Sequence, residues 1–140
     1  MSTITETEIV VRYAETDQMG IVHHSNYAVW YEQARTEFIR HFGLSYGEME
    51  KAGILLPLLE LHCAYGLPAH YEDRLIVRTQ VGLLKPSRVR FDYELRRAGT
   101  DKPLNTGWTL HAFTDPTLRP ISLKKHAPEI YGVLERAMEE

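Results

Sequence analysis

Residues 25–42 read SNYAVWYEQARTEFIRHF, and within them aromatic and aliphatic side chains recur at three- and four-residue steps. That spacing places one set of residues on a single face of an α-helix: Tyr27, Trp30, Tyr31, Ala34, Phe38 and Phe42. Charged and polar residues occupy much of the remainder. Ser25 or Asn26 can cap the start of the helix, and Gly43 can close its end. The pattern predicts a helix of about four and a half turns with an aromatic buried face.

The segments on either side of this helix alternate apolar and polar residues, as β-strands do. One strand is predicted before the helix, at residues 4–13, and four are predicted after it, at residues 54–65, 74–84, 88–98 and 104–114. The third of these four alternates most clearly, with Val89, Phe91, Tyr93 and Leu95 on its inner face. The last places Trp108, Leu110 and Ala112 on one side.

Short links rich in Pro, Gly and Asp separate the later strands, which favours antiparallel neighbours. Ser45 and Glu48 have capping-box spacing for a short helix, and residues 128–138 predict a closing helix that starts at Pro128. One long helix with an aromatic face requires a curved sheet to cover it. We therefore expect an α+β fold in which a bent antiparallel sheet wraps a long central helix.

Composition limits the possible classes of protein. The chain has 140 residues, 44% hydrophobic and 25% charged, so a single globular domain over residues 1–140 is expected. The formal charge of −3 gives no basic surplus for nucleic acid, and the single Cys63 cannot form an internal disulfide. No signal-peptide pattern or run of ~20 apolar residues is present, so we expect a cytoplasmic protein without membrane insertion. A domain of this size has little volume for a deep pocket, so a long substrate could require a partner subunit.

Residues 13–31, YAETDQMGIVHHSNYAVWY, combine features that suit acyl transfer. Asp17 lies several residues before the helix, and Gly20 allows the chain to bend between them. The N–H groups around His24–Tyr27 lie at the helix N-terminus, where they lack intrahelical partners and attract negative charge. A carboxylate beside such an oxyanion site can promote attack on an acyl group. The alternative is that Asp17 only caps the helix.

The run D-x-x-G-I-V-x-H-x-x-Y from Asp17 to Tyr27, followed by W-Y-E-Q-A-R-T, resembles the 4-hydroxybenzoyl-CoA thioesterase family of hotdog-fold proteins. It is most similar to the small bacterial acyl-CoA thioesterases of the Tol–Pal-associated branch. The stretch Pro68–Asp73, PAHYED, resembles the family's P-A-x-x-x-D entry to the next strand. The resemblance covers about residues 5–125. It implies a hotdog fold, hydrolysis of acyl-CoA to free acid and CoA without a cofactor, and a homodimer with interfacial active sites that pairs into a homotetramer.

The same resemblance assigns roles to individual residues. It places the catalytic carboxylate at Asp17, as nucleophile or general base, and the oxyanion-binding backbone N–H at His24, whose side chain could also contact substrate. Tyr27 matches a tyrosine near the site, and Met19 departs from the smaller residue common in relatives, so it could line the acyl pocket. The full predicted set for substrate binding is Tyr13, Met19, Gly20, Tyr27, Trp30, Tyr31, Glu60, Lys85, Arg88 and Arg90.

Several members of this set also have plainer interpretations. Trp30 and Tyr31 could be core residues, and Glu60 could be solvated instead of facing a partner's site. Lys85, Arg88 and Arg90 belong to a basic stretch, residues 85–97, that could bind the phosphates of CoA or form an ordinary strand surface.

Other chemistries are less well supported by the sequence. The seven histidines show no metal-ligand spacing, so no metal site is expected, and Cys63 lacks the surroundings of a nucleophile. A hydratase acting on acyl thioesters and a non-catalytic acyl-thioester binder remain as alternative functions.

Overall fold

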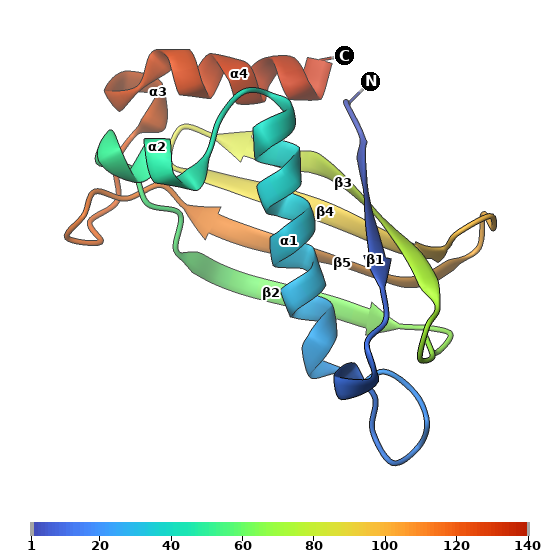
Figure 1. Cartoon of the computed structure of the whole chain (residues 1–140). Helices are drawn as coiled ribbons and strands as arrows, with labels where there is room; N and C mark the ends of the chain where they lie inside the picture. The colour runs from blue at the N-terminus through green and yellow to red at the C-terminus, as the bar shows by residue number, and fades with distance from the viewer. Residues whose placement is uncertain (1, 140) are drawn as a thin grey trace.

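The computed structural model describes residues 2–139 and contains a five-stranded antiparallel sheet with a long helix across one face (Figure 1). The elements in chain order are β1 (Thr5–Val10), the 3₁₀ turn η1 (Tyr13–Glu15), α1 (Ser25–His41), α2 (Tyr46–Lys51), β2 (Leu58–Tyr65), β3 (Arg74–Lys85), β4 (Arg88–Arg97), β5 (Pro103–Ala112), α3 (Leu123–His126) and α4 (Pro128–Glu139). The expected α+β fold is confirmed. Residues 1 and 140 of the predicted single domain lie outside the described residues.

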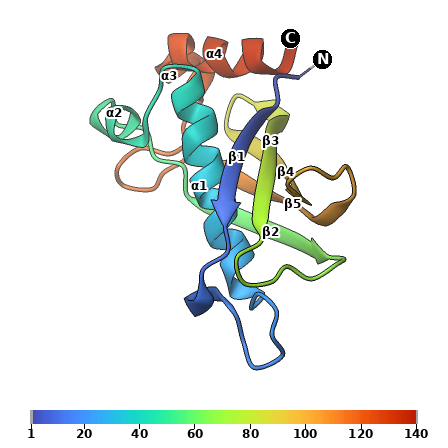
Figure 2. The ribbon, with the colours of Figure 1, turned by 45° about the vertical axis from the view of Figure 1, so that its right-hand side comes forward.

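The strand order is β1-β3-β4-β5-β2, so β1 and β2 are the two edges of the sheet. The sheet bends around α1, and the two chain ends lie close together beside α4 (Figure 2). A hydrogen bond of 2.7 Å from the Thr3 N–H to the Ala137 carbonyl joins them. None of the helices in residues 2–139 is long and apolar enough to cross a membrane.

The buried face of α1 is the predicted aromatic stripe, with Ile39 added and Phe42 only half-buried at the C-terminal end. Gly43 follows with a φ of +81°, which confirms it as the residue that closes the helix. The predicted N-cap is wrong, because His24 occupies that position and makes no side-chain capping bond. Ser25 bonds to the His23 ring instead, and Asn26 reaches back to the Glu15 carbonyl.

Two strands are shorter than predicted by several residues, for local reasons. β1 ends at Val10 because the chain turns into η1, and β2 begins at Leu58, after Pro57. The inner faces of β3 and β4 are apolar as predicted, and Leu75, Val77, Phe91 and Leu95 are fully buried there.

Strand β5 presents small and polar residues to α1. Gly107, Thr109 and His111 pair with inward-facing residues of β4, so they share the inner face. Trp108, Leu110 and Ala112 lie together as predicted, but on the outer face of the sheet. The inner face has no room for a side chain at position 107, because the Tyr31 ring lies close to it. A Cβ atom at Gly107 would lie 2.5 Å from the Tyr31 hydroxyl oxygen.

A chain of hydrogen bonds crosses the core beside β5. The Arg35 guanidinium donates to the Tyr93 hydroxyl at 3.0 Å, and that hydroxyl lies 2.6 Å from Thr109 Oγ1. Thr109 Oγ1 is 2.9 Å from His111 Nε2, and His111 Nδ1 is 3.1 Å from the Leu56 carbonyl. A carbonyl can only accept, so Nδ1 carries the proton and Nε2 accepts from Thr109. Burial lowers the pKa of His111 to about 4, and the nearby Arg35 charge acts in the same direction.

This buried histidine predicts a loss of stability in mild acid. The unfolded chain binds a proton near pH 6.5 and the folded chain only near pH 4, so stability falls as pH drops through this window. His111 should account for a loss of about 2 kcal/mol between pH 7 and pH 5. Urea unfolding at fixed protein concentration measures it. His111→Gln should remove this part of the pH dependence, whereas His126→Gln, at an exposed position, should retain it; equal slopes for the two variants would contradict the prediction.

Candidate functional site

A tight loop between η1 and α1 holds Asp17. The loop is closed by a bridge between Thr16 and Val22, and the Asp17 N–H donates to the Ile21 carbonyl at 2.9 Å. At its tip the Met19 N–H donates to Asp17 Oδ1 at 2.8 Å, and Gly20 has a φ of +80°. Only glycine adopts that φ without strain, which confirms the predicted bend. The half-buried Asp17 carboxylate therefore has one oxygen held by the turn.

The start of α1 offers fewer amide donors than the sequence suggested. The Ser25 N–H bonds to His23 Nδ1 at 3.2 Å, and those of Asn26 and Tyr27 bond to the carbonyls of His23 and His24. Among the described residues, the N–H of His24 makes no such bond. The available oxyanion donor is thus the single amide to which the resemblance assigned that role.

Asp17 and His24 line one cavity of about 300 Å³. Loop residues Met19 and Ile21 and the first turn of α1, including Tyr27, form part of its wall. The segment Tyr65–Pro68, from the last residue of β2 onward, forms another part of the wall. The Tyr65 hydroxyl donates to the His24 carbonyl at 3.3 Å, and the rings of Tyr65 and Tyr27 meet edge to face with centroids 5.2 Å apart.

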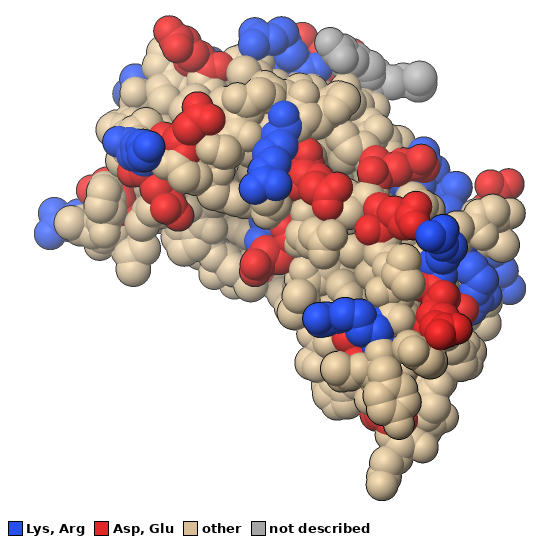
Figure 3. Space-filling view, viewed as in Figure 1, with Lys and Arg blue, Asp and Glu red and all other residues tan. Residues whose placement is uncertain are grey.

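The charge of this cavity comes mainly from one carboxylate. Burial raises the pKa of Tyr27, so its phenol stays neutral near neutral pH. Figure 3 shows that the lower end of the molecule, where Figure 1 places the loop after β1, carries few charged side chains in this view. Among residues 2–139 no group of three or more potential metal ligands occurs. In a cavity lined by both, a carboxylate can promote attack on a carbonyl carbon, and an unpaired amide can stabilise the oxyanion that forms.

Three predicted binding residues are not among those that line this cavity: Tyr13, Trp30 and Tyr31. Tyr13 is 77% exposed and packs edge to face on Tyr71. Trp30 and Tyr31 are buried: the Trp30 indole bonds to Glu15, and Tyr31 bonds to Asn105 and stacks on Tyr93. Trp30 and Tyr31 are therefore core residues in this protomer, as their alternative interpretation predicted.

The other predicted binding residues lie far from it. Glu60 pairs with Leu110 on the outer face of the sheet and is exposed. Lys85 and Arg88 flank the β3–β4 turn, where Arg88 opposes Ala112, whereas Tyr65 at the cavity opposes Asn105. Seven residues of β5 span roughly 23 Å, so these cations are remote from the cavity in one protomer. Arg90 is engaged with Asp92 at 2.8 Å.

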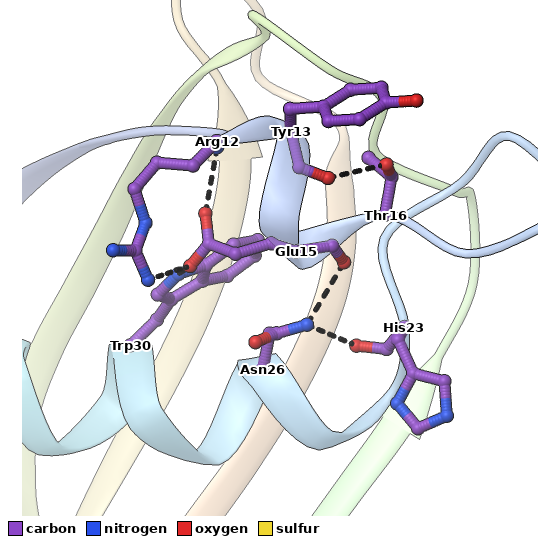
Figure 4. A network of polar contacts seen from close by, with 7 residues as sticks. All are labelled: Arg12, Tyr13, Glu15, Thr16, His23, Asn26 and Trp30. Carbon is purple, nitrogen blue, oxygen red and sulfur yellow. Dashed lines mark hydrogen bonds and ion pairs between the residues drawn. The ribbon is translucent and has the colours of Figure 1, made fainter.

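Sequence reasoning missed Tyr65 and Glu15. Tyr65 reaches the cavity only through the tertiary fold, and no local spacing marks it. Glu15 stands two residues before Asp17 and is 4% exposed, surrounded by partners that Figure 4 shows. No signal in the sequence separates this buried carboxylate from the many solvated ones.

Comparison with known proteins now identifies the family. The sequence matches the profile of the thioesterase-like superfamily over residues 11–134. The chain belongs to the thioesterase-like superfamily. Among curated proteins, YneP of Bacillus subtilis, named as a candidate acyl-CoA thioesterase, is 33% identical over 96% of this chain and 97% of its own. The acyl-CoA thioester hydrolase YbgC of Escherichia coli is 27% identical over 89% and 92% of the two chains.

Solved structures support the same assignment. A DHNA-CoA thioesterase from Staphylococcus aureus superimposes with a TM-score of 0.89 at 34% identity, covering 96% of this chain and 90% of that one. As a thioesterase-like superfamily member, the protein has the hotdog fold and is a thioester hydrolase, as the sequence predicted. The matched residues 11–134 include Asp17, His24 and both walls of the cavity.

Proposed function

We propose that this protein hydrolyses acyl-CoA thioesters to a free acid and CoA in the cavity between loop 16–24 and the β2–β3 connection. The observation that carries the proposal is that Asp17 and His24, whose backbone N–H has no hydrogen-bond partner among the described residues, line one cavity in a member of a thioesterase superfamily. The names of YneP and YbgC agree with CoA as the thiol carrier.

The geometry supports a simple mechanism. The thioester carbonyl oxygen lies against the His24 N–H, which stabilises the developing oxyanion. Asp17 either attacks the carbonyl carbon to form a mixed anhydride or removes a proton from the attacking water. The C–S bond then breaks, and CoA leaves as a thiolate. On the anhydride route, water then cleaves the anhydride, which releases the free acid and restores the Asp17 carboxylate. A thiol has a pKa near ~8.5, so the leaving group needs no strong general acid, and none is required in the cavity.

For the acyl group we favour an aromatic ring, as in the 4-hydroxybenzoyl-CoA thioesterases, over the acyl groups of the Tol–Pal branch. The faces and edges of Tyr27 and Tyr65 form an aromatic corner of the cavity wall. Aromatic rings prefer such edge and offset contacts. The 34% identical Staphylococcus aureus structure is named a DHNA-CoA thioesterase, and DHNA-CoA is an aromatic acyl-CoA, so this name points the same way.

A thiol-trapping assay across aromatic, short aliphatic and long aliphatic acyl-CoAs tests the activity and the preference together. We expect release of free CoA, fastest from an aromatic thioester. Hydration of an enoyl-CoA without thiol release would favour the hydratase alternative, and absence of turnover with every substrate would refute the proposal.

We further propose that the active form is a homodimer joined through β2, with dimers pairing into a tetramer. β2 is an edge strand with exposed apolar residues along it: Leu58, Leu59, Leu61 and Tyr65. A long apolar edge strand left open in water pairs readily with another strand. Pairing there would place a second chain next to Tyr65 at the cavity, and only a neighbouring protomer could bring Lys85 and Arg88 toward a bound CoA.

Replacing Leu61 by Lys tests this interface. A charge at this edge position should convert the dimer to a monomer in light scattering and lower thioester hydrolysis by more than about 10-fold, since like charges then meet across the interface. Val10→Lys is the matched control, because Val10 is 48% exposed on the opposite edge strand and Leu61 is 46% exposed. A dimeric, fully active Leu61→Lys variant would exclude β2 as the interface.

A further inference from the structure

We infer that Glu15 is the residue that positions both Asp17 and the His24 amide. The inference rests on the proposed function, since it concerns the geometry of that site. Glu15 lies outside the residues that line the cavity, so it acts through its neighbours and not by touching the substrate. Its contacts come from its carboxylate and from its backbone carbonyl, and Figure 4 shows both sets.

The carboxylate joins the chain just after β1 to the second turn of α1. Oε1 accepts the Arg12 N–H at 2.8 Å, and Oε2 accepts the Trp30 indole N–H at 2.8 Å. The exposed Arg12 guanidinium is 3.4 Å from Oε2. A carboxylate that is 4% exposed is stable only when its oxygens are bonded in this way. The bonds from the Arg12 backbone N–H and the Trp30 indole hold η1 at a defined place against the helix, whereas the exposed guanidinium contributes little.

The backbone carbonyl of Glu15 closes loop 16–24, which contains Asp17 and His24. It accepts the His23 N–H at 2.8 Å and the Asn26 side-chain amide at 2.9 Å, and Asn26 also donates to the His23 carbonyl at 3.2 Å. Both ends of the loop are therefore fixed at one residue. Asp17 follows Glu15 by two residues, and His24 directly follows His23.

This arrangement transmits the position of Glu15 to the chemistry. If Glu15 shifts, the carboxylate of Asp17 and the His24 N–H move relative to each other, although the cavity wall formed by Tyr65–Pro68 stays in place. A misplacement of about 1 Å in a catalytic group can cost about 10²-fold in rate. Binding depends on the whole wall and should change much less.

Glu15→Gln is the variant that tests this role. An amide has only one acceptor oxygen, so it cannot accept from both Arg12 and Trp30. We expect kcat to fall by about 10- to 100-fold while KM stays within about two-fold, because only the reacting groups are displaced. Trp30→Phe, which removes one donor and keeps a ring, should lower kcat less. When Trp30→Phe is combined with Glu15→Gln, the double variant should lose little more kcat than Glu15→Gln alone, since both substitutions remove the same bond.

Two controls separate positioning from a general effect of charge. Glu8→Gln removes an exposed carboxylate on β1, and Arg12→Gln removes the guanidinium but keeps the backbone N–H that Glu15 binds. Both should retain kcat within about two-fold, because exposed ion pairs contribute little.

Backbone hydrogen exchange gives a readout that does not depend on activity. In Glu15→Gln the amides of residues 16–24 should exchange faster, while those of β3 and β4 exchange as in the wild-type protein. If wild-type protein hydrolyses no acyl-CoA, the proposed function fails, but exchange still tests the positioning role. Three results would each overturn the inference. The first is unchanged exchange in loop 16–24, and the second is an unchanged kcat in an active enzyme. The third is a rise in KM as large as the fall in kcat, together with a lower unfolding midpoint.

Discussion

Asp17→Asn should lower kcat for acyl-CoA hydrolysis by more than about 10³-fold, the largest effect that we expect from any single substitution. Removal of one oxyanion donor from an acyl-transfer enzyme costs about 10²–10³-fold, and in the proposed mechanism Asp17 is either the nucleophile or the base that activates water. Asparagine can neither form an anhydride nor accept a proton at this position. The measurement is the rate of thiol release at saturating substrate.

The fold should survive this substitution. Asparagine keeps the oxygen that accepts the Met19 N–H at 2.8 Å, so the turn that presents residue 17 remains bonded. The unfolding midpoint of Asp17→Asn should therefore match that of the wild-type protein. Asp101→Asn, at a fully exposed carboxylate on the β4–β5 turn, is the control and should leave the rate unchanged. Near-normal hydrolysis by Asp17→Asn would remove the carboxylate from the mechanism.

The predictable part of the site is local in sequence. Asp17, Met19, His24 and Tyr27 fall within one turn and the start of one helix, so their proximity follows from chain geometry alone. Tyr65 reaches the same cavity from the end of β2, and this contact depends on the whole sheet. Spacing along the chain contains no information about such a contact.

The cations beside the β3–β4 turn show the reverse case, in which residues close in sequence lie far from the cavity of their own protomer. Lys85, Arg88 and Arg90 are close in sequence and share a sign, which suggested a phosphate site. The strand register places them at the end of the sheet opposite the cavity, because β3 and β4 run the length of the molecule between the two (Figure 1). Charge clustering identifies a surface but not its distance from a second motif.

The hydrophobic pattern also did not predict which residues of β5 face the core. Hydrophobic alternation detects the face that excludes water, but Thr109 and His111 are buried because each finds a hydrogen-bond partner. Trp108, Leu110 and Ala112 of this strand point to the outer face instead. A sequence pattern records hydrophobicity, whereas burial of a polar residue depends on partners that distant segments supply.

Gly107→Ala should lower the free energy of unfolding by about 3 kcal/mol, the largest loss of stability that we predict. A Cβ atom at this position would lie 2.4 Å from the His62 carbonyl oxygen and 2.7 Å from Cε2 of the Tyr31 ring. Neither neighbour is free to move. The carbonyl belongs to the paired backbone of β2, and the ring is stacked on Tyr93 and bonded to Asn105.

The same substitution at Gly132 separates the steric effect from glycine's flexibility. Gly132 lies within α4, where the nearest atom to an added Cβ is 3.4 Å away, at the end of the Arg136 side chain. There alanine should raise stability by about 0.5–1 kcal/mol, because it favours the helix. Urea unfolding of both variants at one protein concentration should thus give shifts of opposite sign. If Gly107→Ala were as stable as the wild-type protein, α1 could move away from β5 without a loss in the free energy of unfolding. The close contact of Tyr31 would then not be the reason that position 107 lacks a side chain.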